Sequence, residues 1–274
     1  MLGLRRTHAK SERIGCRSRT LLLALALALA VAPLHSEERS NVSVYAGALS
    51  VDEGLDDRQF AGAFVNIYDG DVGLHGDFLY VDREEDAAYG AFGISFRPFE
   101  CVRPKFTIGT STDNNNILPE FATSLSVQIK PEEGSGWVIT PGLLYREYRS
   151  GTSETRPSLE VVKYFSLPID KNGYYVAQGR LSASVSDSNT QRYAIAGGLQ
   201  TVRSDGMTYG LTVEGGWLDR DPLVGNGATS RYYALRPSVA FRFLQGRELF
   251  LRGEYADTDA YTVVGATIGV RIEF

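Results

Sequence analysis

The chain is poor in the residues that usually carry cross-links or metal sites. Its 274 residues include only 2 cysteines, 3 histidines and 2 methionines. One of the cysteines, Cys16, lies in an N-terminal segment that we expect to be removed, which leaves Cys101 without a partner for an internal disulfide. No apolar run of about 18 residues follows that segment, so a helical membrane protein is excluded. Zinc-ligand spacings and a phosphate-binding glycine loop are also missing, and we expect neither a metal nor a cofactor.

The N-terminal segment has the three parts of a secretory signal peptide. Six bases and one acid accompany an apolar run over 21–32, and the small residue Ser36 stands before two acids. The apolar run is too short to span a bilayer as a helix. We therefore expect residues 1–36 to be a cleaved signal peptide and residues 37–274 to form a single exported domain.

Removal of the signal peptide makes the remaining chain strongly acidic. Six of 28 bases and one of 33 acids are lost, which leaves 22 bases against 32 acids and a net charge of about −10. Nucleic-acid binding requires a basic face, so nucleic acid is not expected as a partner.

Segments in which apolar and polar residues alternate recur along the chain from Asn41 onward. Alternation at period two indicates strands with one apolar and one polar face, and its repetition is the sequence signature of a transmembrane barrel. We predict an all-β, antiparallel barrel of about fourteen strands, with twelve as the alternative count. The predicted strands are 41–51, 58–68, 72–82, 87–97, 103–111, 121–130, 136–148, 157–167, 174–186, 191–203, 207–219, 230–244, 248–257 and 261–274.

Alternation alone also fits a soluble sandwich or barrel, in which the apolar face points inward. Two further patterns favour the membrane barrel. Connections of a compact class and of a longer, more polar class alternate roughly along the chain, as periplasmic turns and outer loops do. Aromatic residues also stand at strand ends, where a membrane interface would hold them. They are Trp137, Tyr145, Tyr175, Tyr209, Trp217, Tyr233, Tyr255 and Tyr261.

The last eight residues, 267–274, have the same alternation and end on an aromatic residue. This pattern resembles the C-terminal signal of bacterial outer-membrane barrels, which the barrel-assembly machinery reads. We expect the strand to close the barrel against 41–51, with its apolar side chains toward lipid. The assembly signal would consist of Ile268, Val270, Ile272 and Phe274.

Two irregularities interrupt the strand pattern. Pro141 and Pro237 fall inside predicted strands, where each removes a backbone donor, so a bulge or an end of pairing is expected there. In 157–167, either Glu160 or Lys163 must face lipid, and a bulge at 161–162 would restore the register.

Several stretches of the chain resemble the YaiO family of outer-membrane barrels. They are Ile117-Leu118-Pro119-Glu120-Phe121, Gly136-Trp137-Val138, the run from Leu144 to Tyr148, and Pro157-Ser158-Leu159-Glu160. The similarity covers roughly residues 95–274 and rests on the order of several weak motifs. It implies an exported barrel in the outer membrane of a Gram-negative bacterium, and related barrels take part in glycan export.

The exported domain contains few candidate catalytic or metal-binding residues. His75 and Asp77 share the predicted inward face of one strand and could serve an outer-membrane hydrolase, but a histidine held in a hydrogen-bond network is the alternative we favour. Asp205, Asp219 and Asp221 could bind calcium, but solvated acidic loops are the explanation we favour. No catalytic residue is therefore assigned.

The predicted inward face is basic. Inward-pointing acids are fewer and comprise Asp77, Glu214, Glu254 and Glu273. The bases either pair with these acids and fill a narrow barrel or line a wet lumen that favours anions. They form a predicted ladder of Arg97, Lys105, Lys130, Arg180, Arg192, Arg236, Arg242, Arg252 and Arg271.

These patterns together predict a monomeric, non-enzymatic outer-membrane barrel with lipid as its surroundings. Its partners would be the assembly machinery and an anionic solute or polysaccharide, which it passes like a porin or helps to export. A hydrolase using His75 and Asp77 and a soluble periplasmic β-protein are the alternatives.

Overall fold

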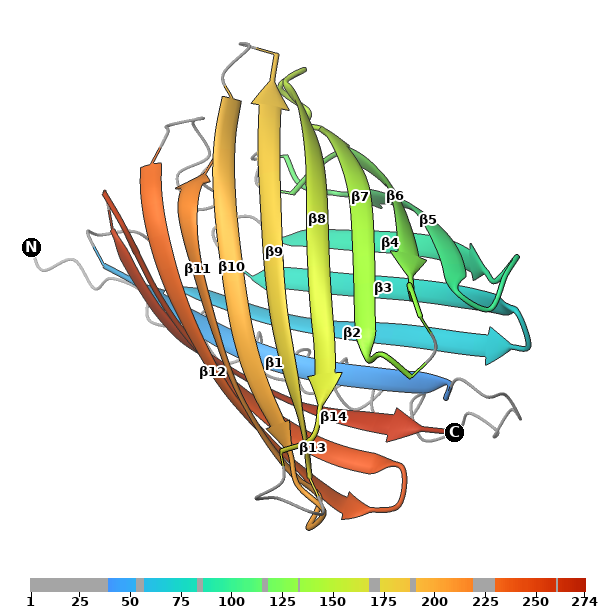
Figure 1. Ribbon diagram of the computed structural model, residues 1–274. Coiled ribbons are helices and arrows are strands. Elements are labelled where there is room, and N and C mark those ends of the chain that lie inside the picture. Colours follow the sequence, from blue (N-terminus) through green and yellow to red (C-terminus); the bar gives the residue numbers. More distant parts are fainter. Residues whose placement is uncertain are drawn as a thin grey trace, which may run out of the picture.

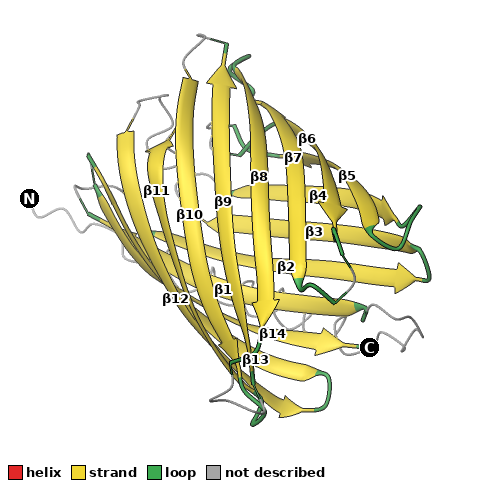
Figure 2. Cartoon of the chain, in the orientation of Figure 1, coloured by secondary structure: helices red, strands yellow, loops and turns green. Residues whose placement is uncertain are grey.

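The computed structural model describes residues 39–52, 57–82, 86–114, 118–132, 134–167, 173–187, 191–218, 230–259 and 261–274. They form fourteen antiparallel strands that close into one barrel, as Figures 1 and 2 show. No helix in this part of the chain is long and apolar enough to cross a membrane. The predicted signal peptide, 1–36, lies outside the described residues. The strands are β1 (Asn41–Val51), β2 (Arg58–Asp69), β3 (Val72–Asp82), β4 (Ala87–Phe96), β5 (Val102–Ser111), β6 (Phe121–Ile129), β7 (Trp137–Glu147), β8 (Ser153–Phe165), β9 (Tyr174–Ser186), β10 (Gln191–Val202), β11 (Met207–Leu218), β12 (Ser230–Leu244), β13 (Arg247–Thr258) and β14 (Thr262–Glu273).

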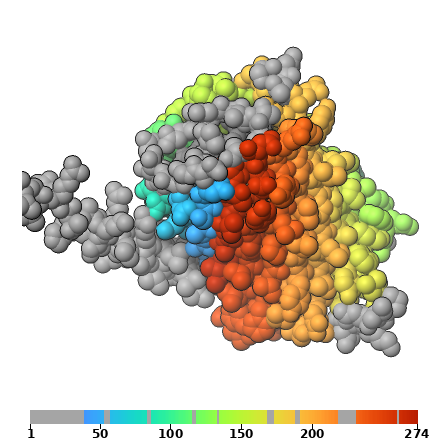
Figure 3. Space-filling view, turned by 90° about the vertical axis from the view of Figure 1, so that its left-hand side faces the viewer, coloured from blue at the N-terminus to red at the C-terminus, as the bar shows by residue number. Residues whose placement is uncertain are grey.

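The barrel closes where the first and last strands meet, as predicted. β1 pairs with β14 along its whole length, from Asn41 opposite Glu273 to Val51 opposite Val263. Figure 3 shows the two strands side by side, blue against red. The closing residue takes part as well, because the Phe274 N–H donates to the Ser40 carbonyl oxygen at 2.9 Å. The C-terminal strand is therefore fixed to its end.

Apolar side chains cover the outside of the barrel and polar side chains cover the inside. Leu181, Phe92 and Ile195 on the outer face are 56 %, 55 % and 62 % exposed. Inward-facing Ser95 and Arg192, in contrast, are buried. This arrangement is the reverse of a soluble sandwich, in which apolar side chains fill the core, and it removes that alternative for the fold.

The largest error in the predicted boundaries concerns β8. The strand was expected to begin at Pro157 but begins at Ser153, so the connection before it covers 148–152 rather than 149–156. The added residues are held by polar contacts that periodicity does not reveal. The Ser153 N–H and hydroxyl both donate to Asp187 at the start of the β9–β10 connection.

Pro141 and Pro237 cause no bulge, but each locally interrupts the pairing with one neighbouring strand, which is one of the two outcomes expected. Pro237 pairs with Leu211 of β11, while the β12–β13 pairing skips Arg236 and Pro237 and resumes in the same register. Pro141 behaves alike, being paired with Leu159 of β8 but not with β6. Each proline therefore loses pairing toward one neighbour only, which the barrel tolerates because the other ladder holds the strand in place.

The predicted bulge at 161–162 is also absent. The β7–β8 register runs without a shift from Trp137 opposite Lys163 to Glu147 opposite Ser153. Lys163 points outward near the end of β8, where its ammonium group lies 4.6 Å from the centre of the Trp137 ring. Glu160 consequently faces the interior, and the one register shift among the described pairs falls between Arg242 and Leu244.

Connection lengths follow the predicted alternation only loosely. The end of the barrel that holds both described termini has the two tightest turns, 70–71 and 245–246, while 219–229 at the other end is the longest connection. However, 166–173 at the first end exceeds 259–261 at the second. Tyr261 also departs from its predicted interfacial place, because it is buried inside the barrel against Val51 and Val263.

Around the β1–β14 seam, long inward side chains lean across glycines of the neighbouring strand. The Phe60 ring of β2 occupies the place that a Cβ at Gly47 of β1 would take, and the Tyr45 ring occupies the same place at Gly62. Phe250 does the same over Gly269 on β14. These rings therefore lie against the wall instead of projecting toward the barrel axis.

This packing makes Gly47 sensitive to substitution. In Gly47→Ala the new methyl group would meet the Phe60 ring and would lie 2.6 Å from the Ala266 carbonyl oxygen, which belongs to the backbone and cannot swing away. We expect a loss of about 1–3 kcal/mol, typical of overpacking, seen as a lower temperature for the unfolding shift on a denaturing gel. Gly90→Ala is the matched control, because nothing lies within 4 Å of its Cβ position. Equal melting of the two variants would contradict this account.

Candidate functional site in the barrel interior

Strand register places the predicted bases on the interior face. Lys105, Arg180, Arg192, Arg236, Arg242, Arg252 and Arg271 share the inward parity, and Arg97 and Lys130 directly follow β4 and β6. Further inward bases and acids were missed, although the same parity would have found most of them. The missed residues are Arg58, Arg103, Arg146, Arg156, Glu154, Glu160 and Glu248.

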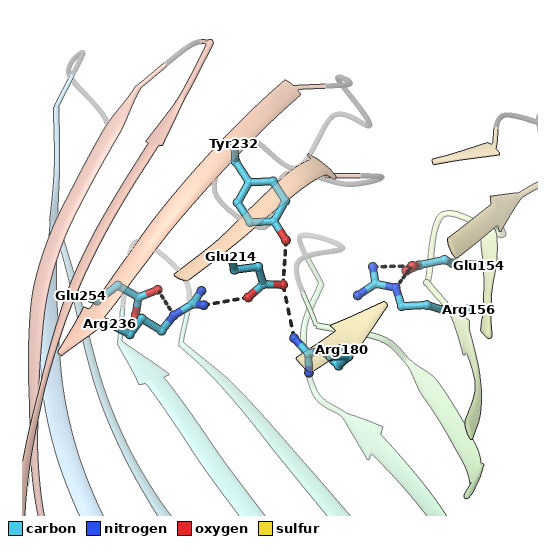
Figure 4. Close-up of polar contacts among 7 residues, drawn as sticks. All are labelled: Glu154, Arg156, Arg180, Glu214, Tyr232, Arg236 and Glu254. Atoms are coloured by element: carbon cyan, nitrogen blue, oxygen red, sulfur yellow. Dashed lines mark hydrogen bonds and ion pairs between the residues drawn. The ribbon is translucent and has the colours of Figure 1, made fainter. Parts of the chain in front are cut away.

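The densest polar cluster centres on Glu214 of β11, as Figure 4 shows. One carboxylate oxygen accepts from Arg236 Nη1 at 2.7 Å, and the other accepts from Tyr232 Oη at 2.8 Å and from Arg180 Nη2 at 3.2 Å. Arg236 also donates through Nε to Glu254 at 3.1 Å. The carboxylate is thus held by three strands, β9, β11 and β12, and it fixes two arginines in position.

Small residues make this cluster possible. Arg180 on β9 reaches Glu214 on β11 across the intervening strand, where Ala196 is the residue opposite both. Gly198 and Gly210 continue this low surface beside Ala196. A larger side chain on β10 would separate the arginine from its carboxylate, so the ion pair depends on β10 as much as on the charged residues.

A second ion cluster lies near the start of β8, and Figure 4 shows it across from the Glu214 cluster. Glu154 accepts from Arg156 at 2.5 Å and lies 3.8 Å from Arg146 of β7. The Glu154 side chain is only 6 % exposed, compared with about one third for each arginine. Glu214 and Glu154 therefore each lie beside more than one inward arginine.

The pairing does not fill the barrel. A hollow of about 330 Å³ lies on the inner wall over β8–β13, beside the Glu214 cluster. Arg252 lines it and is exposed, and it makes no ion pair with any described residue. Gln178, Gln200 and Arg180 are likewise exposed although they face inward, so water reaches this wall.

The sequence-based His75–Asp77 pair is not brought together as a catalytic unit. His75 is buried, with Nδ1 at 2.6 Å from Asn66 Oδ1 and Nε2 at 2.9 Å from Ser95 Oγ. Both ring nitrogens are thus occupied by neutral partners, and Asp77 is exposed to the interior instead. The geometry corresponds to a histidine in a structural hydrogen-bond network and does not favour the hydrolase.

Metal binding receives no support from the part of the chain that the structure describes. It contains no group of three or more histidine, cysteine, aspartate or glutamate residues able to hold an ion. Asp205 bonds Arg203 and the Met207 N–H within its turn, while Asp219 and Asp221 lie outside the described residues. Cys101 is exposed and unpaired.

Solved structures with a similar fold include bacterial outer-membrane proteins. A bacterial polysaccharide outer membrane secretin matches with a TM-score of 0.55 and 7 % identity, covering 88 % of this chain and 100 % of its own. The outer membrane protein Omp33 of Acinetobacter baumannii matches with a TM-score of 0.52 and 8 % identity, covering 86 % and 99 %. No family model and no curated protein matches the chain, so the YaiO resemblance stays a prediction.

These findings define the class of protein. The chain folds as a closed, fourteen-stranded antiparallel barrel and is similar in fold to bacterial outer-membrane proteins. Its interior carries arginines and carboxylates, and its exterior is apolar.

Proposed function

We propose that the protein is a channel of the Gram-negative outer membrane that passes small anionic solutes. The observation that carries the proposal is the solvent-exposed arginine-bearing wall beside the interior hollow, with Arg252 unpaired among the described residues. A wet lumen lined by guanidinium groups attracts anions and repels cations. Of the acids on this side of the barrel, Glu214 and Glu254 are bound to arginines, while Glu160 makes no ion pair with a described residue. The acids therefore weaken this preference without reversing it.

The membrane location follows from the outer surface. Outward Trp137 lies with Lys163 at one end of the barrel, while Trp217 lies 5.9 Å from Arg231 at the other. Aromatic rings beside bases are typical of the two membrane interfaces, and the exposed aliphatic side chains between them suit lipid. Export by the predicted signal peptide, and insertion through Ile268, Val270, Ile272 and Phe274 by the assembly machinery, complete the proposal.

The strand number supports an open interior. Strands about 4.8 Å apart, tilted by about 40°, give a fourteen-stranded barrel a backbone radius of roughly 14 Å. Eight-stranded barrels are narrow enough for side chains to fill. With rings leaning on the wall near the seam and a hollow over β8–β13, fourteen strands leave space for water and a small solute.

Planar-bilayer recording of the purified full-length chain tests this function. Under a salt gradient of potassium chloride, we expect single-channel currents whose reversal potential has the sign of anion preference. Membrane fractionation of expressing cells provides the companion measurement of location. A cation-selective reversal potential, or the absence of any current from correctly folded barrels, would refute the channel.

A further inference from the structure

The interior hollow contains a repeated arrangement of side chains. Two register rows cross it, each running from an arginine through a hydroxyl residue and a glycine to a glutamine. The first row is Arg252, Ser238, Gly210 and Gln200 on β13 to β10. The second row is Arg236, Thr212, Gly198 and Gln178 on β12 to β9.

The second row repeats the first one strand further around the barrel. Arg236 lies diagonally from Arg252 across β12 and β13, and each other member of the second row is diagonal to its counterpart in the first. Diagonal neighbours in an antiparallel sheet are about 7–8 Å apart. The wall therefore presents the same set of groups twice. The second set is displaced from the first by this diagonal distance, which is roughly the size of one small molecule.

The polar groups of both rows are available to a ligand. The side chains of Gln178, Gln200, Thr212 and Ser238 make no hydrogen bond with another described residue. Arg252 makes no ion pair with one either, while Arg236 uses two of its five N–H donors on Glu214 and Glu254. Cations, amides and hydroxyls thus line the hollow together, and the glycines allow the Gln178 amide and the Ser238 hydroxyl to lie flat against the wall.

This combination matches a hydroxylated carboxylate better than a simple anion. A carboxylate would be recognised by arginine, whereas hydroxyl groups need the donors and acceptors that amides and hydroxyls supply. Glu160 also lines the hollow and makes no ion pair with a described residue, so it accepts from hydroxyls and disfavours densely charged ligands. The volume of about 330 Å³ lies at the lower end of small-molecule sites, which suits two linked sugar units.

We propose that the two rows form a two-unit binding site for an acidic oligosaccharide of uronic-acid type. Each row takes one sugar unit, with its carboxylate on the arginine and its hydroxyls on the serine or threonine and the glutamine. The proposal rests on the channel function only in that the solute must reach the interior. Binding itself is measurable without current.

Isothermal titration of the detergent-solubilised full chain with digalacturonic acid tests the site. We expect saturable binding that is stronger than for the single uronic acid, and little or none for succinate or maltose, which provide only carboxylates or only hydroxyls. Gln200→Leu and Gln178→Leu should each weaken binding by about fivefold, the value of one hydrogen bond. Gln59→Leu is the control, since Gln59 is exposed on the outer face of β2.

The outcomes separate this site from the channel. Equal binding of succinate and digalacturonic acid, or unchanged affinity in both glutamine variants, would overturn the binding site even if anion-selective currents are present. Binding with the expected order from barrels that carry no current would uphold the site and remove the channel. A further check is Arg252→Gln, which should reduce binding of the charged disaccharide most.

Discussion

Replacing Arg252 by glutamate should lower the anion-to-cation permeability ratio several-fold. Arg252 is exposed in the hollow and makes no ion pair with a described residue, so the change reverses a charge without breaking a described contact. A unit charge about 7 Å from a passing ion contributes about 0.6 kcal/mol in water, and the reversal acts with opposite sign on anions and cations. Salt at 0.1 M screens part of this effect, which leaves a shift on the order of fivefold.

The reversal potential in a bilayer under a potassium chloride gradient measures that ratio. Arg247→Glu is the matched control, because Arg247 belongs to the same strand, β13, and is exposed on the opposite face. The control should keep the selectivity of the unmodified protein. An equal shift in both variants would show that charge acts from the surface and not from the interior.

Replacing Glu214 by glutamine should have the opposite effect on selectivity and should also destabilise the barrel. The substitution preserves shape but removes the negative charge that Arg180 and Arg236 share. Two inward guanidinium groups would then be less neutralised, which raises anion preference. The Glu214 side chain is 14 % exposed, and loss of its charged hydrogen bonds should cost about 1–3 kcal/mol.

Thermal unfolding followed by gel shift, together with the reversal potential, tests both effects in one variant. Glu248→Gln provides the comparison, since Glu248 also faces inward but, among the described residues, forms an ion pair only with Arg271, at 3.4 Å. It should change selectivity in the same direction with a smaller loss of stability. A Glu214→Gln barrel that melts like the unmodified protein would mean that the cluster does not hold the wall together.

The strand pattern was predictable because side-chain alternation is a local property. β1, β3, β9 and β12 have the predicted bounds, and strand register puts the arginines of the predicted ladder that lie within strands on one face of the wall. Where polar residues fall outside the alternation, the prediction failed. The start of β8 was missed because Ser153 is held by Asp187 and Glu154 lies beside Arg146 of β7, and these residues are distant in sequence and meet only in three dimensions.

The sequence predicted which face of the strands carries the site, but not how the residues of the site are arranged relative to one another. Parity placed Arg180, Arg236 and Glu214 inside the barrel, but it does not say which residues of different strands lie at the same height. That depends on register, which here brings Glu214 between the two arginines across Ala196. The hollow and its two rows depend on the same register, so alternation alone contains no signal for them.

The rings that lean on glycines near the seam separate two properties of the lumen. Tyr45, Phe60 and Phe250 set how far the wall of β13, β14, β1 and β2 intrudes, whereas the charges of the hollow are borne by β8–β13. A change that lifts a ring from its glycine would narrow the bore and reduce conductance for every ion alike. Charge selectivity would stay nearly constant. Most of the strands that set the conductance of this barrel can therefore vary in sequence independently of the strands that set its ion selectivity.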